Sequence, residues 1–113
     1  MDYNPLGSKE SKMDIKDQIA KDIKDNKVML YMKGTPDYPQ CGFSARVVEI
    51  LKSYQVPFGA RNVLEDENLR QGIKAFTDWP TIPQIFINGE FVGGCDIVTE
   101  MHQNGELKKI LGS

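Results

Sequence analysis

The stretch WPTIPQIFINGEFVGGCD, residues 79–96, decides the fold. Its centre predicts a β-hairpin, because the segments 84–88 (QIFIN) and 90–92 (EFV) are typical of strands and meet at Asn88-Gly89, a two-residue turn that antiparallel strands favour. Two glycines then break the second strand, and the residues that follow show the apolar spacing of a helix. This part of the sequence therefore predicts two antiparallel strands that lead directly into a helix.

Upstream of the hairpin, the pattern predicts a βαβ unit. Residues 28–33, VMLYMK, form a compact apolar run that is typical of a buried strand, and residues 58–63 predict a second, weaker strand. Between them, residues 42–55 carry apolar side chains at helical spacing. A βαβ unit makes a right-handed parallel pair, so the hairpin completes a four-stranded mixed sheet.

Further helices are expected to cover this sheet. The same apolar spacing indicates helices in four other segments, which are 14–25, 65–77, 95–104 and the short 106–111. The sequence therefore predicts an α/β fold, with a four-stranded mixed sheet and helices on both faces.

Composition excludes several classes of function. The chain has 113 residues, of which 40% are hydrophobic and 27% charged, as in ordinary globular proteins. A net charge of −2 does not favour binding to nucleic acid. The longest apolar run, Val28 to Met32, is too short to span a bilayer, which takes about 20 residues. We therefore expect neither a nucleic-acid partner nor a membrane.

The first 13 residues, MDYNPLGSKESKM, show no periodicity and contain Pro5 and Gly7. They predict a flexible tail, which is either native or left by cloning for expression. The folded domain is expected to occupy residues 14–113. Two cysteines are too few for a disulfide scaffold, and they indicate a reducing compartment such as the cytoplasm or the mitochondrial matrix.

Cys41 is the first candidate for chemistry, because it follows a strand and a loop and opens a helix. Free amide groups and the helix dipole stabilise a thiolate there, and Lys33 adds positive charge. The polar neighbours of Cys41 favour a reactive thiol over a buried packing residue. One helical turn later, Ser44 stands where a dithiol site needs its second cysteine. Cys41 is therefore expected to work with an external thiol or as a metal ligand.

Cys95 allows two interpretations from its position alone. It follows two glycines and opens a helix, so it is either a distal resolving thiol or a small residue packed beneath the site. His102 lies two helical turns further on and is expected at the surface. The close ligand pairs of a structural zinc site are absent from the sequence, so a zinc site within one chain is not expected.

Two further signals remain open at this level. Ile82-Pro83 is a candidate for a cis peptide bond beside a free strand edge, but proline statistics alone favour the trans form. Arg70 and Lys74 lie four residues apart on one helix face, and with Lys33 they could bind a small anion. A solvated charged face is the ordinary alternative for such a pair.

Taken together, these motifs resemble the monothiol glutaredoxins of the CGFS type. The resemblance runs from about Ile15 to Leu111 and depends on four motifs in the same order and spacing. These are Lys33-Gly34-Thr35-Pro36, Cys41-Gly42-Phe43-Ser44, Trp79-Pro80-Thr81-Ile82-Pro83-Gln84 and Gly93-Gly94-Cys95-Asp96.

The resemblance implies a thioredoxin-like fold with Pro83 in the cis form and a bound glutathione. By this likeness, the carboxylate at the glycine end of glutathione meets three cations, Lys33, Arg70 and Lys74. The backbone of Ile82 pairs with its cysteine, Cys41 faces its sulfur, and Cys95 and Asp96 hold its γ-glutamyl end.

The resemblance also implies a function. Such proteins typically carry a [2Fe–2S] cluster between two protomers and deliver it to iron–sulfur acceptor and assembly proteins. Cys41 is then the metal ligand that each chain supplies, in a homodimer that the cluster bridges and that separates into monomers without it. The alternative is a glutathione-dependent oxidoreductase that acts on glutathione mixed disulfides, an activity that is usually weak in this family.

Overall fold

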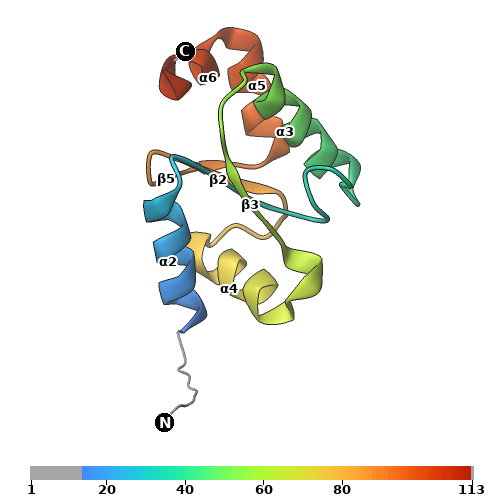
Figure 1. Ribbon diagram of the computed structural model, residues 1–113, viewed down its shortest axis with the longest axis vertical. Coiled ribbons are helices and arrows are strands. Elements are labelled where there is room, and N and C mark those ends of the chain that lie inside the picture. Colours follow the sequence, from blue (N-terminus) through green and yellow to red (C-terminus); the bar gives the residue numbers. More distant parts are fainter. Residues whose placement is uncertain (1–13, 113) are drawn as a thin grey trace.

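A computed structural model describes residues 14–112 of the chain, so the expected tail at residues 1–13 lies outside the described residues. Helices and strands alternate along most of the sequence, as the apolar pattern predicts (Figure 1). In chain order, the elements are α2 (Ile15–Asp25), β2 (Val28–Met32), α3 (Gly42–Ser53), β3 (Gly59–Asn62), a 3₁₀ turn (Val63–Glu65), α4 (Glu67–Thr77), β4 (Gln84–Ile87), β5 (Glu90–Gly93), α5 (Cys95–Asn104) and α6 (Glu106–Leu111).

The four strands form one mixed sheet in the order β3-β2-β4-β5. Strands β2 and β3 pair in parallel, whereas β4 runs antiparallel to both β2 and β5. This confirms the predicted combination of a βαβ unit and a hairpin. Strand β3 is shorter than predicted, because the Asn62 side chain accepts a hydrogen bond from the Leu64 N–H at 2.9 Å and starts the 3₁₀ turn at Val63.

Helices cover both faces of the sheet, as the sequence predicts. Helices α3, α5 and α6 lie on one face, and α2 and α4 on the other (Figure 1). A hydrophobic core lies between the sheet and the helices on each face. Along β2, Leu30 and Met32 pack into the core beneath α3, α5 and α6, while Met29 and Tyr31 pack into the core beneath α2 and α4. Because both faces of β2 are buried, its sequence is a continuous apolar run without a polar alternation.

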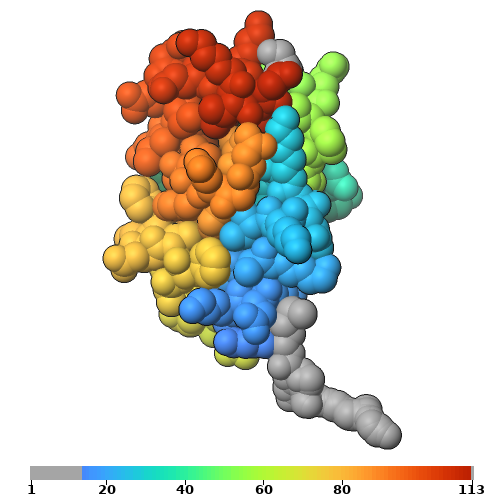
Figure 2. All heavy atoms as spheres, turned by 90° about the vertical axis from the view of Figure 1, so that its left-hand side faces the viewer, coloured from blue at the N-terminus to red at the C-terminus, as the bar shows by residue number. Residues whose placement is uncertain are grey.

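Figure 2 shows the arrangement of the elements from another side of the molecule. Helix α6 lies at one end of the molecule, α2 lies at the other, and the segment around β5 lies between them. Two hydrogen bonds attach the C-terminal end of α6 to the rest of the chain. The Lys27 ammonium donates to the carbonyl oxygen of Leu111 at 3.1 Å, and the Asn88 amide donates to that of Ile110 at 3.4 Å.

A buried carboxylate joins α2 to the sheet. The Asp22 side chain is 10% exposed and accepts hydrogen bonds from the Arg61 guanidinium, one of them at 2.8 Å, and from the Tyr31 hydroxyl at 2.9 Å. Burial raises the pKa of Tyr31, and the charge of Asp22 raises it further, so its hydroxyl stays protonated and donates. The network links α2, β2 and β3 through charged and polar groups that all have partners.

Replacing Asp22 by Ala is expected to lower the free energy of unfolding by about 2 kcal/mol. The substitution leaves Arg61 and Tyr31 without their acceptor, and a hydrogen bond to a charged group contributes roughly 1.5–3 kcal/mol. We place the value low in that range because Arg61 is 39% exposed and regains water. Urea denaturation measures the change.

Asp25→Ala on the same helix is the matched control. Asp25 pairs at 2.6 Å with Lys21, and more than half of each side chain is exposed, so solvent replaces this contact readily. The control is expected to leave the urea midpoint unchanged. Equal losses in the two variants would show that the buried network contributes nothing beyond surface charge.

Candidate active site around Cys41

Cys41 occupies the position directly before α3, with an extended backbone (φ −153°, ψ 136°), and its side chain is half-buried. Because the first amide groups of a helix have no partner within the helix, they point toward whatever lies at its start. The Cys41 side chain makes no capping hydrogen bond, but the nearby backbone N–H groups of Phe43 and Ser44 favour the thiolate form of its sulfur. The structure therefore places the thiol where the sequence predicts it, at an amide-rich helix start.

These groups set the ionisation of the thiol. Burial on its own raises the pKa of Cys41, and this is the largest of the separate effects. The backbone N–H groups of Ser44 and Phe43, the Ser44 hydroxyl and the positive charge of Lys33 together outweigh it. The net result is a pKa of Cys41 below the ordinary value of a cysteine thiol, which raises the fraction of reactive thiolate at neutral pH.

Ser44 has a structural role as well as an electrostatic one. Its side chain is fully buried, and its hydroxyl oxygen accepts a hydrogen bond from the backbone N–H of Lys33 at 3.1 Å. This contact ties the end of β2 to the first turn of α3 and so fixes Lys33 relative to Cys41. The position that would hold the second sulfur of a dithiol site carries a hydroxyl group that cannot form a disulfide.

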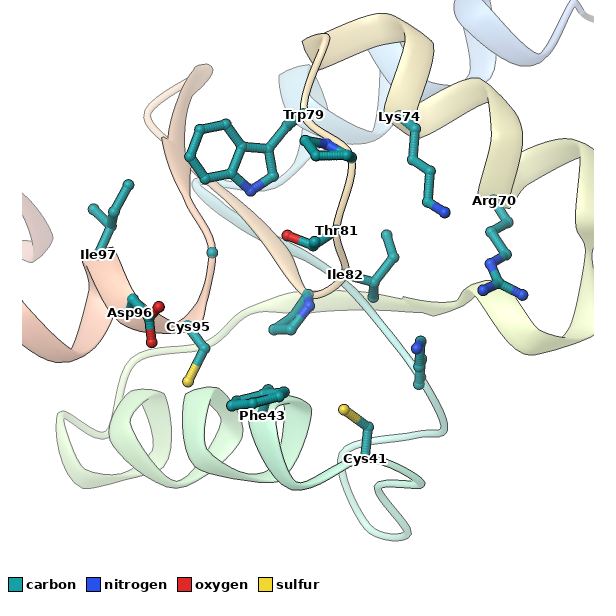
Figure 3. A pocket seen from close by; sticks show the side chains of 14 residues that line it. Cys41, Phe43, Arg70, Lys74, Trp79, Thr81, Ile82, Cys95, Asp96 and Ile97 are labelled. Atoms are coloured by element: carbon teal, nitrogen blue, oxygen red, sulfur yellow. The ribbon is translucent and has the colours of Figure 1, made fainter.

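Cys41 opens onto a cavity of about 580 Å³, a volume typical of small-molecule sites. The cavity lies between the end of β2, the starts of α3 and α5, helix α4 and the loop 79–83 (Figure 3). All seven residues singled out from the sequence line it, namely Lys33, Cys41, Arg70, Lys74, Ile82, Cys95 and Asp96.

Charge is distributed unevenly around this cavity. Figure 3 shows Arg70 and Lys74 on one side and Cys95 and Asp96 on the other, with Cys41 and Ile82 between them. The first backbone amides of α5 lie beside Asp96, and no side chain caps that helix. Nε of Arg70 is buried and has no hydrogen-bond partner within residues 14–112. The cavity thus offers cations at one end and free backbone donors at the other.

The loop 79–83 supplies the remaining part of the cavity lining. Its Ile82-Pro83 peptide bond is cis, as the family resemblance implies and contrary to the trans form that proline statistics favour. Among residues 14–112, no hydrogen bond uses the backbone N–H or C=O of Ile82. The backbone N–H and C=O of Ile82, which lines the cavity together with Cys41, are therefore free to bond to a ligand.

Comparison with known proteins identifies the family of the chain. A family profile described as glutaredoxin matches residues 28–92, which is more than half of the chain. The chain belongs to the glutaredoxin family. Since Cys41-Gly42-Phe43-Ser44 holds a single thiol and the most similar relatives are named monothiol glutaredoxins, it belongs to the monothiol group.

Individual relatives cover most of this glutaredoxin. It is 55% identical over 111 residues to a rice protein named "Monothiol glutaredoxin-S4, mitochondrial", covering 98% of this chain and 60% of that protein. It is 59% identical over 93 residues to "Probable monothiol glutaredoxin 2" from Rickettsia typhi, covering 82% and 84% respectively. The chain thus spans about 60% of the length of the first of these relatives.

Solved structures show the same fold. The solution structure of reduced poplar apo GrxS14 matches with a TM-score of 0.76 and 51% identity, over 88% of this chain and 94% of that one. The mixed four-stranded sheet with helices around it is therefore the thioredoxin-like architecture of glutaredoxins.

The other side chains of this glutaredoxin that could bind a metal ion lie apart from Cys41 or already contact other residues. Cys95 is half-buried, packs against the core and has its sulfur 3.9 Å from the Thr99 hydroxyl. His102 is exposed at the surface, as expected, and its Nδ1 lies 2.7 Å from the Tyr54 hydroxyl. Within residues 14–112, no three His, Cys, Asp or Glu side chains gather closely enough to hold a metal ion. None of the helices described there has the length and apolar character that crossing a bilayer requires.

Sequence reasoning missed two aromatic residues of the site. Phe43 follows the apolar spacing of α3, yet its side chain is 63% exposed and lines the mouth of the cavity. Trp79 also lines the cavity, and its ring meets Phe91 at a centroid distance of 5.7 Å. The signal that was available for Phe43 is its place in the first turn of α3, next to Cys41, where a side chain projects beyond the core.

Alkylation of Cys41 is expected to show a pKa below that of an ordinary cysteine thiol. In a Cys95→Ser background, the rate of reaction with iodoacetamide is measured against pH. Lys33→Gln removes a positive charge near the sulfur and is expected to move the midpoint upward. Lys52→Gln makes the same charge change in the last turn of α3 and is expected to leave the midpoint unchanged. A wild-type midpoint at or above about 8.5 would contradict the electrostatic argument.

Proposed function

We propose that this glutaredoxin binds glutathione in the cavity beside Cys41 and that two copies together carry a [2Fe–2S] cluster. The observation that carries the proposal is the pairing of one activated thiol with an adjacent cavity whose ends differ in charge. A lone thiol with Ser44 one turn away needs a second thiol from outside the chain. Glutathione supplies one and has charged groups at both ends.

The orientation of glutathione follows from the charges around the cavity. Its glycine carboxylate lies toward Lys33, Arg70 and Lys74, where the cations are. Its cysteine pairs with the free backbone of Ile82, which brings the two sulfur atoms together at Cys41. The α-carboxylate of the γ-glutamyl end meets the first amides of α5 near Cys95, and its ammonium group meets the Asp96 carboxylate.

The residues present fit a cluster that is shared between two chains. A [2Fe–2S] cluster commonly takes four thiolates. Each chain has two cysteines, and Cys95 packs against the core at the end of the cavity assigned to the γ-glutamyl group. Cys41 from two chains and the thiols of two bound glutathione molecules then make up the set of four. A chain without cluster is expected to be a monomer.

The partners proposed for this carrier are iron–sulfur assembly and acceptor proteins in a reducing compartment, the cytoplasm or the mitochondrial matrix. Both Cys41 and Cys95 are free thiols, which such a compartment preserves. The exposed ring of Phe43 beside Cys41 gives an incoming protein an apolar contact next to the cargo.

A second candidate function uses the same residues, and the lowered pKa of Cys41 favours it. The Cys41 thiolate attacks the glutathione sulfur of a mixed disulfide, forms a Cys41–glutathione disulfide and releases the substrate as a thiolate. A second glutathione thiolate then attacks the glutathione sulfur of that disulfide, which gives oxidised glutathione and restores Cys41. Because the external thiol does the work of a resolving cysteine, this route does not need a second thiol at Ser44.

Charge reversal at the cationic end is expected to weaken glutathione binding. Arg70→Glu and Lys74→Glu each replace attraction of the glycine carboxylate by repulsion, and loss of one charged hydrogen bond alone corresponds to roughly a tenfold weaker affinity or more. Isothermal calorimetry at moderate salt measures the affinity. Lys108→Glu on α6 makes the same change on an exposed lysine outside the cavity and is the control. Unchanged affinity in Arg70→Glu would refute the orientation proposed here.

Anaerobic reconstitution with iron, sulfide and glutathione tests the carrier function. We expect visible absorbance, a species that sizes as two chains, and two glutathione molecules per cluster. Cys41→Ser is expected to abolish all three, because it removes the only thiolate proposed to come from each chain.

Two controls make this test decisive. Cys95→Ser is expected to weaken the assembly at most, and removal of glutathione by gel filtration is expected to release the iron. A loaded form that sizes as a monomer, or that keeps its iron without glutathione, would overturn the shared-cluster proposal. Reduction of mixed disulfides by a chain that takes up no cluster would favour the second function.

A further inference from the structure

Gln84 is a fully buried polar residue at the start of β4, directly after the loop that lines the cavity. It does not line the cavity itself. We propose that Gln84 is the positioning residue that aims the Ile82 N–H into the cavity, an inference that rests on the glutathione site proposed above. The role is specific to the side-chain amide and its three hydrogen bonds.

The amide of Gln84 lies at the centre of the segment from Thr77 to Thr81. Its Nε2 group donates to the carbonyl oxygen of Trp79 at 2.9 Å and to that of Thr81 at 3.1 Å. Its Oε1 atom accepts from the Thr77 hydroxyl at 2.8 Å. Both amide hydrogens are therefore used, and the positions of the two carbonyl groups determine which way the amide group points.

The loop depends on this side chain because its own backbone lacks the usual partners. Pro80 and Pro83 have no N–H to donate, and residues 79–83 belong to none of the strands. The Trp79 N–H bonds to the Lys74 carbonyl oxygen and the Thr77 hydroxyl, both at 3.2 Å. Gln84 supplies the matching donors for the carbonyl groups that a sheet ladder would otherwise satisfy.

The bond to Thr81 has a direct effect at the cavity. A peptide group is planar, and in the trans form its C=O and N–H point in opposite directions. The bond from Thr81 to Ile82 is not among the cis bonds of the described chain, so these two groups share one trans plane. When Gln84 holds the Thr81 oxygen, the Ile82 N–H points away from Gln84. Because Ile82 lines the cavity and Gln84 does not, we infer that this is the cavity side of the loop.

A purely structural role for Gln84 would predict something different. Loss of the amide would then lower stability and leave the ligand-binding properties of the folded protein unchanged. A positioning role predicts weaker binding in a sample that is fully folded, together with a changed response of one amide group, that of Ile82. Both quantities can be read in the same titration of ¹⁵N-labelled protein with glutathione.

The test compares wild type with Gln84→Met, which keeps the length of the side chain and removes its hydrogen-bonding groups. We expect a dissociation constant for glutathione raised about three- to tenfold, the range of one net hydrogen bond. In wild type, the Ile82 amide resonance is expected to shift strongly on saturation. In Gln84→Met that shift is expected to shrink. The shift of the Asp96 amide, at the other end of the ligand, is expected to stay the same.

Two further variants complete the design. Gln103→Met makes the same substitution at an exposed glutamine of α5 and is expected to change neither the affinity nor the Ile82 shift. Thr77→Val removes the hydroxyl that bonds to Gln84 Oε1 and accepts from the Trp79 N–H. It is expected to weaken glutathione binding by a smaller factor than Gln84→Met does. If Gln84→Met does not fold, Thr77→Val replaces it in the test.

The possible outcomes distinguish failure of the positioning role from failure of the proposed glutathione site. If folded Gln84→Met binds as wild type does with an unchanged Ile82 shift, the positioning role is refuted and the glutathione site stands. Unchanged binding in Thr77→Val, where Gln84→Met is unfolded, refutes it equally. If wild type itself shows no binding at millimolar glutathione, the proposed function fails, and the role of Gln84 fails with it.

Discussion

The site depends on the stabilisation of negative charge on a single atom, the sulfur of Cys41. A thiolate in a partly desolvated position needs donors that are already in place, because burial by itself favours the neutral thiol. The first turn of α3 provides them, and the Ser44 hydroxyl fixes that turn to the end of β2. The strand, the helix start and the basic residue Lys33 are thus held as one unit, and the chemistry of the thiol follows from their relative positions.

The second half of the site is arranged on the opposite side of the cavity by a different means. There, the loop 79–83 contains two prolines and lies outside the sheet ladder, and the buried amide of Gln84 bonds to two of its carbonyl groups. The backbone groups of Ile82 have no partner among the described residues. The cavity therefore presents a thiol on one side and free backbone groups on the other.

The main features of the fold follow from apolar periodicity and turn signals. The βαβ pattern of residues 28–63 and the hairpin turn at Asn88-Gly89 predict the sheet, because both depend on local chemistry that the sequence displays directly. The exposure of Phe43 could not be predicted in this way, since helical spacing does not reveal that the first turn of α3 extends beyond the core. The hydrogen bonds of Gln84 were also hidden, because their partners are backbone carbonyl groups, which any residue carries.

The strand order has a consequence for how this protein meets others of its kind. Strands β3 and β5 form the two edges of the sheet, and an exposed edge invites another chain to extend the sheet. Each edge strand here is only four residues long. Arg61 on β3 carries a charge that is already bound to Asp22, and Glu90 on β5 is exposed. Short, charged edges oppose edge-to-edge pairing of sheets, so the sheet itself does not offer copies of this chain an irreversible contact.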